Sequence, residues 1–325
     1  MSEITYIEAI RQALWEEMER DDRVFLIGED IAVYGGAFKI TQGFLERFGE
    51  DRVIDTPIAE SAIIGSAVGA ALMGLRPVVE MQFADFIACA FDQIVNMAAK
   101  FHYRTGTSVP LVIRAPSGGG VHGGPFHSQN PEGWFVHVPG LKVVAPSTPN
   151  DAKGLLKAAI RDPDPVVYFE HKYLYRRVKG KVPQEDCFVP IGKAEVKRDG
   201  TDVTLVCHSK TLSVALKAAE QLAEQDVKAE VLDLRSLRPL DEAAILESVR
   251  KTNRAVVIEE GWPHAGIGAQ VVDLIQRDAF DDLDAPVQRV NQADVPMPYN
   301  KHLERAAKAS PEKVVAAARR VLYLE

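Results

Sequence analysis

One acidic residue stands where an uncharged segment begins. Glu60 follows residues 55–59, Asp-Thr-Pro-Ile-Ala, and no charged residue occurs from 61 to 73. A strand ending at Asp55 and a turn at Pro57 would put Glu60 in the first turn of a helix. There the helix dipole lowers the pKa of a carboxyl group, and burial against apolar neighbours raises it. Glu60 is therefore either a dipole-stabilised surface residue or a carboxyl group tuned for proton transfer.

A second segment combines glycines with two histidines. Five of the seven residues 118–124 are glycine; His122 lies among them and His127 follows. Glycine allows close backbone approaches and imidazole titrates nearest to neutral pH, so the segment suits proton transfer beside a ligand. The alternatives are a flexible loop with incidental histidines and a metal site at His122 and His127. A phosphate-binding P-loop is excluded, because no lysine follows the glycines.

A third glycine motif is incomplete. Residues 266–271, Gly-Ile-Gly-Ala-Gln-Val, begin like a dinucleotide-binding fingerprint, but the third glycine is missing. The preceding predicted strand also ends too early for that motif. We interpret these residues as the closely packed start of a helix.

The pattern of apolar residues predicts the scaffold for these segments. Within the first twenty residues, apolar side chains recur every three or four positions, which predicts an amphipathic surface helix. Short β-rich runs then alternate with helix-like stretches, which favours an α/β fold with parallel sheets covered on both faces. The predicted strands are residues 24–27, 53–55, 78–83, 111–114, 141–145 and 166–170, followed by 203–207, 229–234, 255–259 and 287–290.

A break in this alternation divides the chain. Residues 178–191 contain Gly180, Pro183 and Pro190 among mixed charges, a composition typical of a linker. We therefore expect two parallel-sheet domains, at residues 1–185 and 195–325. The second should end in a helix at about 311–322.

Composition excludes several classes of protein. The 325 residues are 46% hydrophobic and carry a net charge of −8 without a basic stripe, so neither disorder nor nucleic-acid binding is indicated. No apolar run approaches the length of a membrane span, and the first residues do not resemble a secretory signal. The three cysteines are widely spaced and fit no metal or redox pattern. We expect a cytoplasmic protein that binds no membrane.

Nine short motifs are spread over essentially the whole chain, at residues 28–30, 34–36, 55–60, 74–77, 91–94, 127–129, 139–144, 151–156 and 294–299. Together they resemble the beta subunits of the thiamine diphosphate-dependent 2-oxo acid dehydrogenases. The resemblance implies a pyrimidine-binding domain followed by a transketolase C-terminal-like domain, and a cofactor shared with an alpha subunit in an α2β2 heterotetramer.

The resemblance also implies roles for individual residues. Glu60 matches the glutamate that activates the cofactor at its aminopyrimidine ring, and His127 matches a histidine that acts in reductive acylation of the lipoyl group. Ile58, Gln82 and Phe86 match positions that line the cofactor and substrate pocket.

Two metal ions are implied in the same way. The usual Gly-Asp-Gly and Asn-Asn motifs are absent, so the alpha subunit would hold magnesium and the diphosphate. A structural potassium ion would bind largely to backbone oxygen atoms, and Asp164 stands where the family usually has asparagine. The matching potassium positions are Leu111, Ala159, Ile160, Asp162 and Asp164.

The expected activity is oxidative decarboxylation of a 2-oxo acid, with acyl transfer to the lipoyl group of an acyltransferase core component. Residues 82–86 and 127–132 resemble branched-chain members, whereas residues 261–263 and 294–299 resemble pyruvate members. Acetoin dehydrogenase, a free-standing thiamine enzyme and a non-catalytic scaffold are the alternatives. Acidic residues at 281–284 could attract a basic partner or form a solvated turn.

Overall fold

The structure is a computed structural model that describes residues 2–183 and 186–324. Contacts group these residues into two units. The first holds the chain up to Gly118 together with Trp134–Ile191, and the second holds Gly119–Gly133 together with the chain from Gly192 onward. The glycine-rich segment thus belongs to the second unit, although the strands on either side of it in sequence belong to the first. Part of the predicted linker, residues 184–185, lies outside the described residues.

A parallel sheet forms the centre of the first unit. Its strands lie in the order β6-β7-β5-β4-β2-β3, and every neighbouring pair is parallel. All residues of β2, β5 and β7 are buried, as expected for strands covered on both faces. The strands are β2 (Val24–Gly28), β3 (Val53–Asp55), β4 (Arg76–Glu80), β5 (Val112–Ser117), β6 (Lys142–Val144) and β7 (Val166–His171).

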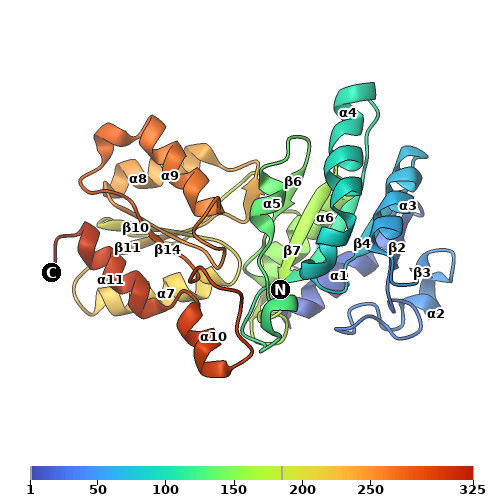
Figure 1. Ribbon diagram of the computed structural model, residues 1–325, viewed down its shortest axis with the longest axis horizontal. Helices are drawn as coiled ribbons and strands as arrows, with labels where there is room; N and C mark the ends of the chain where they lie inside the picture. Colours follow the sequence, from blue (N-terminus) through green and yellow to red (C-terminus); the bar gives the residue numbers. More distant parts are fainter. Residues whose placement is uncertain (1, 184–185, 325) are drawn as a thin grey trace. The chain divides into compact units, whose positions relative to one another are not determined.

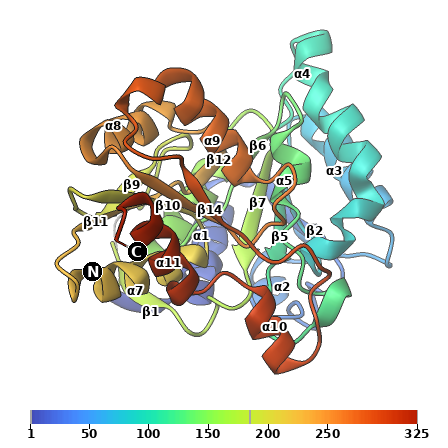
Figure 2. The same ribbon diagram turned by 60° about the vertical axis from the view of Figure 1, so that its left-hand side comes forward.

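Helices complete this layered arrangement. Figure 2 shows α1 and α3 on opposite sides of the strands, and α1 and α6 share one hydrophobic core with strand residues. The helical segments between residues 2 and 183 are α1 (Tyr6–Arg20), α2 (Phe44–Phe48), α3 (Glu60–Leu72), η1 (Ala84–Ala90), η2 (Gln93–Ala98), α4 (Ala99–Thr105), η3 (Gly124–Phe126), α5 (Glu132–Val136) and α6 (Pro149–Arg161).

The first helix differs in two ways from its prediction. It begins at Tyr6, where Thr5 and Glu8 form a capping box, and the preceding residues form β1 (Ser2–Thr5). Strand β1 pairs antiparallel with β8 (Lys179–Val182), inside the predicted linker. The helix is also less exposed than a surface helix, because it packs along α6 and buries a carboxylate. Glu17 is fully buried and its Oε1 lies 2.6 Å from Nη2 of Arg161.

The second unit has its own sheet, in the order β14-β13-β10-β11-β9. Four strands are parallel and β9 is antiparallel to β11. Figure 1 shows α7 and α11 on one face of this sheet and α8 and α9 on the other. The elements are β9 (Glu195–Arg198), β10 (Val203–Cys207), α7 (Thr211–Ala223), β11 (Ala229–Asp233), β12 (Ser236–Arg238), α8 (Glu242–Thr252), β13 (Ala255–Ile258), α9 (Ile267–Asp278), η4 (Phe280–Asp282), β14 (Gln288–Val290), α10 (Lys301–Ala307) and α11 (Pro311–Val321).

The predicted α/β fold with parallel sheets is confirmed. The third predicted strand is shorter than expected: β4 ends at Glu80 rather than at residue 83, because Phe83 already caps the helical turn η1. Across residues 2–183 and 186–324, no helix has both the length and the apolar character that crossing a bilayer requires.

Candidate active site

Three strand ends lie level at one edge of the first sheet. In the parallel register, Gly28 of β2 is opposite Asp55 of β3 and Glu80 of β4. The segments that follow these strands therefore leave from the same edge, where parallel sheets commonly bind ligands. Glycine is needed at position 28, because a Cβ atom there would lie 2.7 Å from the carbonyl oxygen of Glu80.

Glu60 is the first residue of α3, as predicted, and it is half-buried. Its carboxylate makes no hydrogen bond or ion pair to any residue in the described part of the chain. It borders an open hollow of ≈ 680 Å³. The residues that line this hollow with Glu60 are small or uncharged: Ala59, Ser61, Ala62, Gly65, Ser66, Cys89 and Gln93. An unpartnered carboxylate thus faces space that a ligand can enter.

A second carboxyl group lies beside Glu60. Glu29 follows β2 directly and is buried, with 7% of its surface exposed. Burial raises the pKa of Glu29, and the charges of Glu60 and Asp30 raise it further. Sequence reasoning assigned no role to Glu29. Its position immediately after a buried strand was the available signal, but only the parallel register brings it near Glu60.

The other residues expected near the cofactor occupy the same region without lining the hollow. Ile58 is 82% exposed in the turn before α3, and Gln82 is half-buried between β4 and η1. Phe86 lies in η1, which packs against α3, and its ring meets that of Phe83 edge-on at 6.1 Å. None of these three residues is among the described residues that border the hollow. Their expected cofactor contacts stay predictions.

The glycine-rich segment is held by a buried acid in the second unit. Glu304 of α10 is 1% exposed, and its Oε1 accepts a hydrogen bond of 2.7 Å from the Gly120 amide. Its Oε2 lies 2.7 Å from Nδ1 of His122. Gly124 has a φ of +68°, and a Cβ atom there would lie 2.1 Å from the Tyr299 ring. The segment is therefore fixed by contacts rather than free.

His127 lies in this segment, just after η3, and is partly exposed. Its backbone amide donates to the carbonyl oxygen of Gly124 at 3.4 Å. Because the segment belongs to the second unit, His127 and Glu60 are carried by different units. The alternative of a metal site has no support in the described residues, where no group of three or more His, Cys, Asp or Glu side chains could hold an ion.

The incomplete fingerprint at residues 266–271 surrounds a carboxylate. Gly266 is the N-cap of α9, and the Gly268 amide donates to Oε1 of Glu259 at 3.1 Å. Arg289 and Asn291 contact the same oxygen atom, at 2.9 and 2.6 Å. The glycines thus make room for a buried side chain, which confirms the interpretation as a closely packed helix start.

A buried ion triad lies next to the site, and the sequence did not reveal it. Arg114 of β5 is 1% exposed and contacts Glu80 at 2.5 Å and Glu170 at 2.7 Å. Burial alone would lower the pKa of Arg114, but the charges of Glu170 and Glu80 raise it. Burial raises the pKa of Glu170. The triad crosslinks β4, β5 and β7 beneath the edge that carries Glu29.

The residues matched to a potassium site meet other cations in the structure. Nη1 of Arg76 donates to the carbonyl oxygen atoms of Ile160 and Asp162, at 2.7 and 3.2 Å. Lys142 contacts the carboxylates of Asp162 and Asp164 at 2.7 and 3.2 Å. The carbonyl oxygens of Leu111 and Ala159 accept amide hydrogen bonds from Val166 and Asp162. Each carbonyl retains a second lone pair for a metal ion.

Comparison with known proteins finds two domain families in the chain. Residues 2–178 match the family model of the transketolase pyrimidine-binding domain, and residues 192–314 match that of the transketolase C-terminal domain. A solved split-gene transketolase, an inactive beta4 tetramer, superposes with a TM-score of 0.82 at 25% identity, covering 99% of each chain.

Relatives of nearly the same length are more similar. The chain is 51% identical over 322 residues to the 2-oxoisovalerate dehydrogenase subunit beta of Bacillus subtilis, covering 98% of each protein. It is 48% identical over 323 residues to the pyruvate dehydrogenase E1 component subunit beta of Rickettsia conorii, covering 99% of each. The mitochondrial pyruvate dehydrogenase E1 subunit beta-1 of rice is 49% identical, over 99% of this chain and 87% of the rice protein. The chain therefore belongs to the family of 2-oxo acid dehydrogenase E1 beta subunits, which join a transketolase pyrimidine-binding domain to a transketolase C-terminal domain.

Proposed function

We propose that this chain works with an alpha subunit to decarboxylate a 2-oxo acid oxidatively and to transfer the acyl group to the lipoyl group of an acyltransferase. The observation that carries the proposal is the Glu60 carboxylate, which borders an open hollow without a partner among the described residues. The names of the relatives, which act in 2-oxoisovalerate and pyruvate dehydrogenases, support the same reaction class.

The residues around Glu60 fit the aminopyrimidine half of thiamine diphosphate. When bound, this cofactor supplies an electron sink for decarboxylation. Glu60 would hold and release a proton at the ring nitrogen of the aminopyrimidine. Glu29 would lie near it as a second carboxyl group, whose pKa is raised by burial and by the charge of Glu60. The small side chains at Ser61, Ala62 and Gly65 leave room for a ring beside the carboxyl group.

The anionic half of the cofactor would bind elsewhere. The chain has no Gly-Asp-Gly or Asn-Asn motif, so we assign magnesium and the diphosphate to the alpha subunit of an α2β2 heterotetramer. His127 would act during acylation of the lipoyl group, at the entrance to the completed site. Ile58, Gln82 and Phe86 would contact the cofactor or the substrate.

We also propose that potassium binds through carbonyl oxygen atoms at the five matching positions. The support is that the carbonyl oxygens of Ile160 and Asp162 lie close together, since both accept from Nη1 of Arg76, and each keeps a second lone pair for the ion. Thermal unfolding of the assembled protein in potassium or sodium buffers of equal ionic strength tests this ion. A higher midpoint in potassium is expected, and equal midpoints would contradict the site.

The acyltransferase core would dock on the C-terminal domain. The acidic residues at 281–284 are a poor candidate for that contact, because two of the three, Asp282 and Asp284, already form ion pairs. Asp282 lies 3.2 Å from Arg250, and Asp284 lies 2.6 Å from Arg254. These pairs favour the interpretation as a solvated turn.

We keep the domain division at 1–185 and 195–325 as part of the proposal, since the two family models cover 2–178 and 192–314. We also propose that the protein is cytoplasmic. The support is that Cys89, Cys187 and Cys207 are free thiols rather than disulfide partners.

The decisive test of the reaction uses Glu60→Gln in the protein assembled with its alpha subunit. Decarboxylation should be abolished with assembly intact, because the amide cannot exchange a proton with the ring nitrogen. Glu242→Gln is the matched control, since Glu242 is an exposed first-turn glutamate of α8 outside the hollow. Wild-type turnover in Glu60→Gln would instead favour a scaffolding subunit.

A panel of substrates, rather than a variant, identifies the preferred substrate. Turnover of pyruvate, 3-methyl-2-oxobutanoate and acetoin by the assembled wild type should favour one of the two 2-oxo acids. Preference for acetoin would move the chain to the acetoin dehydrogenases.

A further inference from the structure

An imidazole ring and a buried carboxylate form an oriented pair in the second unit. Nδ1 of His122, in the glycine-rich segment, lies 2.7 Å from Oε2 of Glu304, which is 1% exposed. We propose that His122 is a second catalytic histidine in acylation of the lipoyl group, where it donates a proton to the departing lipoyl sulfur, and that Glu304 is its positioning residue. This inference rests on the proposed function and adds a residue to it.

The contact with Glu304 decides which nitrogen of His122 is available. A carboxylate that accepts from Nδ1 keeps a proton on that nitrogen, so the ring gains and loses protons at Nε2. The His122 side chain is 47% exposed, and across residues 2–183 and 186–324 its Nε2 has no hydrogen-bond partner. Nε2 is therefore free to exchange a proton with a bound group or with solvent.

Glu304 is reserved for this segment. Its Oε1 accepts from the Gly120 amide at 2.7 Å, and no lysine or arginine in the described part of the chain forms an ion pair with it. Other buried acids differ, since Glu17 and Glu80 contact arginines at 2.6 and 2.5 Å. The buried carboxylate of Glu304 thus serves the backbone of the segment and the ring of His122.

The backbone at position 122 would favour glycine, and yet this position carries a side chain. His122 has a φ of +61°, and five of the seven residues 118–124 are glycine. A left-handed conformation costs glycine little but strains a residue that has a Cβ atom. Such strain is concentrated at functional sites, where the surrounding contacts hold it in place. The imidazole of His122 is therefore a better candidate for a function than for a structural role alone.

The same segment carries His127, which the proposed function assigns to acylation. The chain folds back at Gly123, where a Cβ atom would lie 2.9 Å from Cβ of His127 and 3.0 Å from its carbonyl oxygen. Gly123 follows His122 directly, so one tight turn carries both imidazoles. A substrate that reaches His127 is thus also near His122.

Acylation needs a proton donor at the lipoyl group. The acyl carbon forms a bond to one sulfur, and the S–S bond breaks with its electron pair passing to the second sulfur. That sulfur takes a proton from Nε2 of His122 and becomes a thiol. The acyl oxygen loses a proton to His127 as its carbonyl group forms. The disulfide gains the two electrons that the acyl carbon loses, and the half-exposed ring of His122 regains its proton from solvent.

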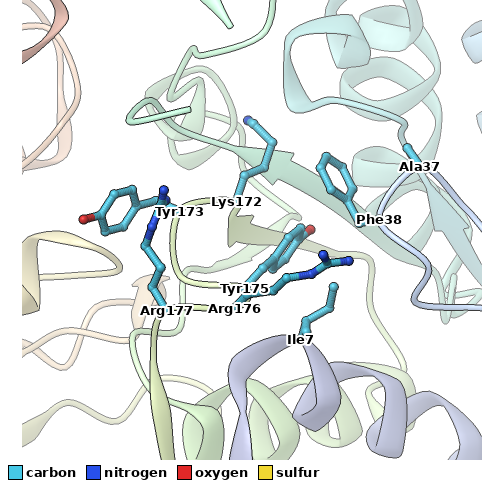
Figure 3. Close-up of a pocket in the computed structure, with 8 residues that line it drawn as sticks. All are labelled: Ile7, Ala37, Phe38, Lys172, Tyr173, Tyr175, Arg176 and Arg177. Carbon is cyan, nitrogen blue, oxygen red and sulfur yellow. The ribbon is translucent and has the colours of Figure 1, made fainter. Parts of the chain in front are cut away.

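Two places in the first unit lack an equivalent pair. His102 lies 2.7 Å from Asp164, but Lys142 shares that carboxylate at 3.2 Å. A cavity of ≈ 440 Å³ lies among α1, the loop after β2 and the turn after β7 (Figure 3). Its described lining contains no carboxyl or imidazole group, and Figure 3 shows its basic side chains pointing apart. Neither place can orient an imidazole for proton transfer as Glu304 does.

Two assays of the protein assembled with its alpha subunit, thiamine diphosphate and magnesium test the proposal. One follows decarboxylation with an artificial electron acceptor, and the other follows acylation of free lipoamide. In His122→Asn, kcat for acylation should fall roughly 10²-fold or more with an unchanged KM for lipoamide, and decarboxylation should stay within about twofold of the wild type. Asparagine tolerates the left-handed backbone but cannot donate the proton.

His302→Asn is the matched control, because His302 is an exposed histidine of α10 whose side chain has no partner in the described chain. Both of its rates should equal those of the wild type. A readout without turnover uses the assembled protein lacking thiamine diphosphate. Lipoamide should slow the modification of His122 by diethyl pyrocarbonate, located by peptide mass spectrometry, and should leave that of His302 unchanged.

Chemical rescue separates proton transfer from a structural role. Glycine also tolerates the backbone of position 122, and added imidazole should raise acylation by His122→Gly at least about tenfold. The same addition should not rescue the double variant with Glu304→Gln, because no carboxylate then orients the imidazole. If His122→Asn does not assemble, the rescue of His122→Gly decides the question.

Three outcomes would overturn the proposal: wild-type acylation in His122→Asn, an equal loss in both assays without rescue by imidazole, or no protection of His122 by lipoamide. A wild type that carries out neither reaction would instead overturn the proposed function, and this inference with it. A wild type that carries out both reactions, with His122→Asn equally active, would overturn this inference alone.

Discussion

Replacing Glu304 tests whether one buried carboxylate positions the glycine-rich segment. Glu304 accepts from the Gly120 amide at 2.7 Å and contacts Nδ1 of His122 at 2.7 Å, while only 1% of its own surface is exposed. Both contacts are lost in Glu304→Ala. The segment that carries His127 would then lose its attachment to α10, although the rest of the second unit keeps its sheet and helices.

The two contacts differ in strength. A hydrogen bond to a buried charged acceptor contributes about 1.5–3 kcal/mol, whereas the half-exposed His122 contact adds about 0–1 kcal/mol. Glu304→Ala should therefore lower the free energy of unfolding by ~2–4 kcal/mol. Glu304→Gln retains an acceptor for the Gly120 amide and removes the charge, so its cost should be ~1–2 kcal/mol.

Urea unfolding of these variants and of His122→Asn measures the energies, and two activity assays measure the consequence. His122 has a φ of +61°, a conformation that asparagine tolerates, so His122→Asn removes the imidazole without adding strain. The double variant with Glu304→Ala should show a coupling energy of roughly 0.5–1 kcal/mol. Acylation of the lipoyl group should fall more than decarboxylation with an artificial electron acceptor. Equal costs for Ala and Gln at position 304, with no coupling to His122, would refute this account.

Two further predictions concern buried charges of the first unit. Arg114→Met should lower the free energy of unfolding by about 3–5 kcal/mol, because Glu80 and Glu170 would be left buried without their cation. A loss below about 1 kcal/mol in urea unfolding would contradict the role of the triad. Burial raises the folded-state pKa of Glu29 above its unfolded value of about 4.3. Its ionisation therefore destabilises the fold as pH rises from the unfolded pKa to the folded one. Glu29→Gln should therefore be more stable than the wild type at pH 7 and should lose part of the decline in stability above pH 4, measured as urea midpoints; identical pH profiles for the two proteins would rule this out.

Most strands could be predicted because their apolar runs are short, buried on both faces and bounded by turn residues. Strands β3 and β10 have the predicted bounds, Val53–Asp55 and Val203–Cys207. The β1–β8 ribbon could not be found in this way. Its residues, Ser2–Thr5 and Lys179–Val182, are mostly polar and lie far apart in sequence, so neither segment has the pattern of a buried strand.

The candidate site could be predicted only in part from the sequence, for a similar reason. The position of Glu60 follows from local signals, the turn at Pro57 and the uncharged helix after it. The proximity of Glu29 follows from the register of β2 and β3, and the attachment of Gly120 to Glu304 joins residues 184 positions apart. Such pairings cannot be predicted from a single sequence, because register and long-range hydrogen bonds depend on the complete fold.

The way in which buried charged groups are paired across the chain gives a reason to assign a function to Glu29 and Glu60. Burying an ion is costly unless a partner balances it, and this rule holds for Arg114, which is bound by two carboxylates. Glu29 and Glu60 depart from the rule, since the charge that most affects Glu29 is another carboxylate and Glu60 has no partner in the described chain. A fold that pairs Glu17, Glu80 and Glu170 with arginines but leaves Glu29 near Glu60 at the edge of a sheet accepts a loss of stability there. That loss is explained if a ligand with a proton-accepting nitrogen completes the site.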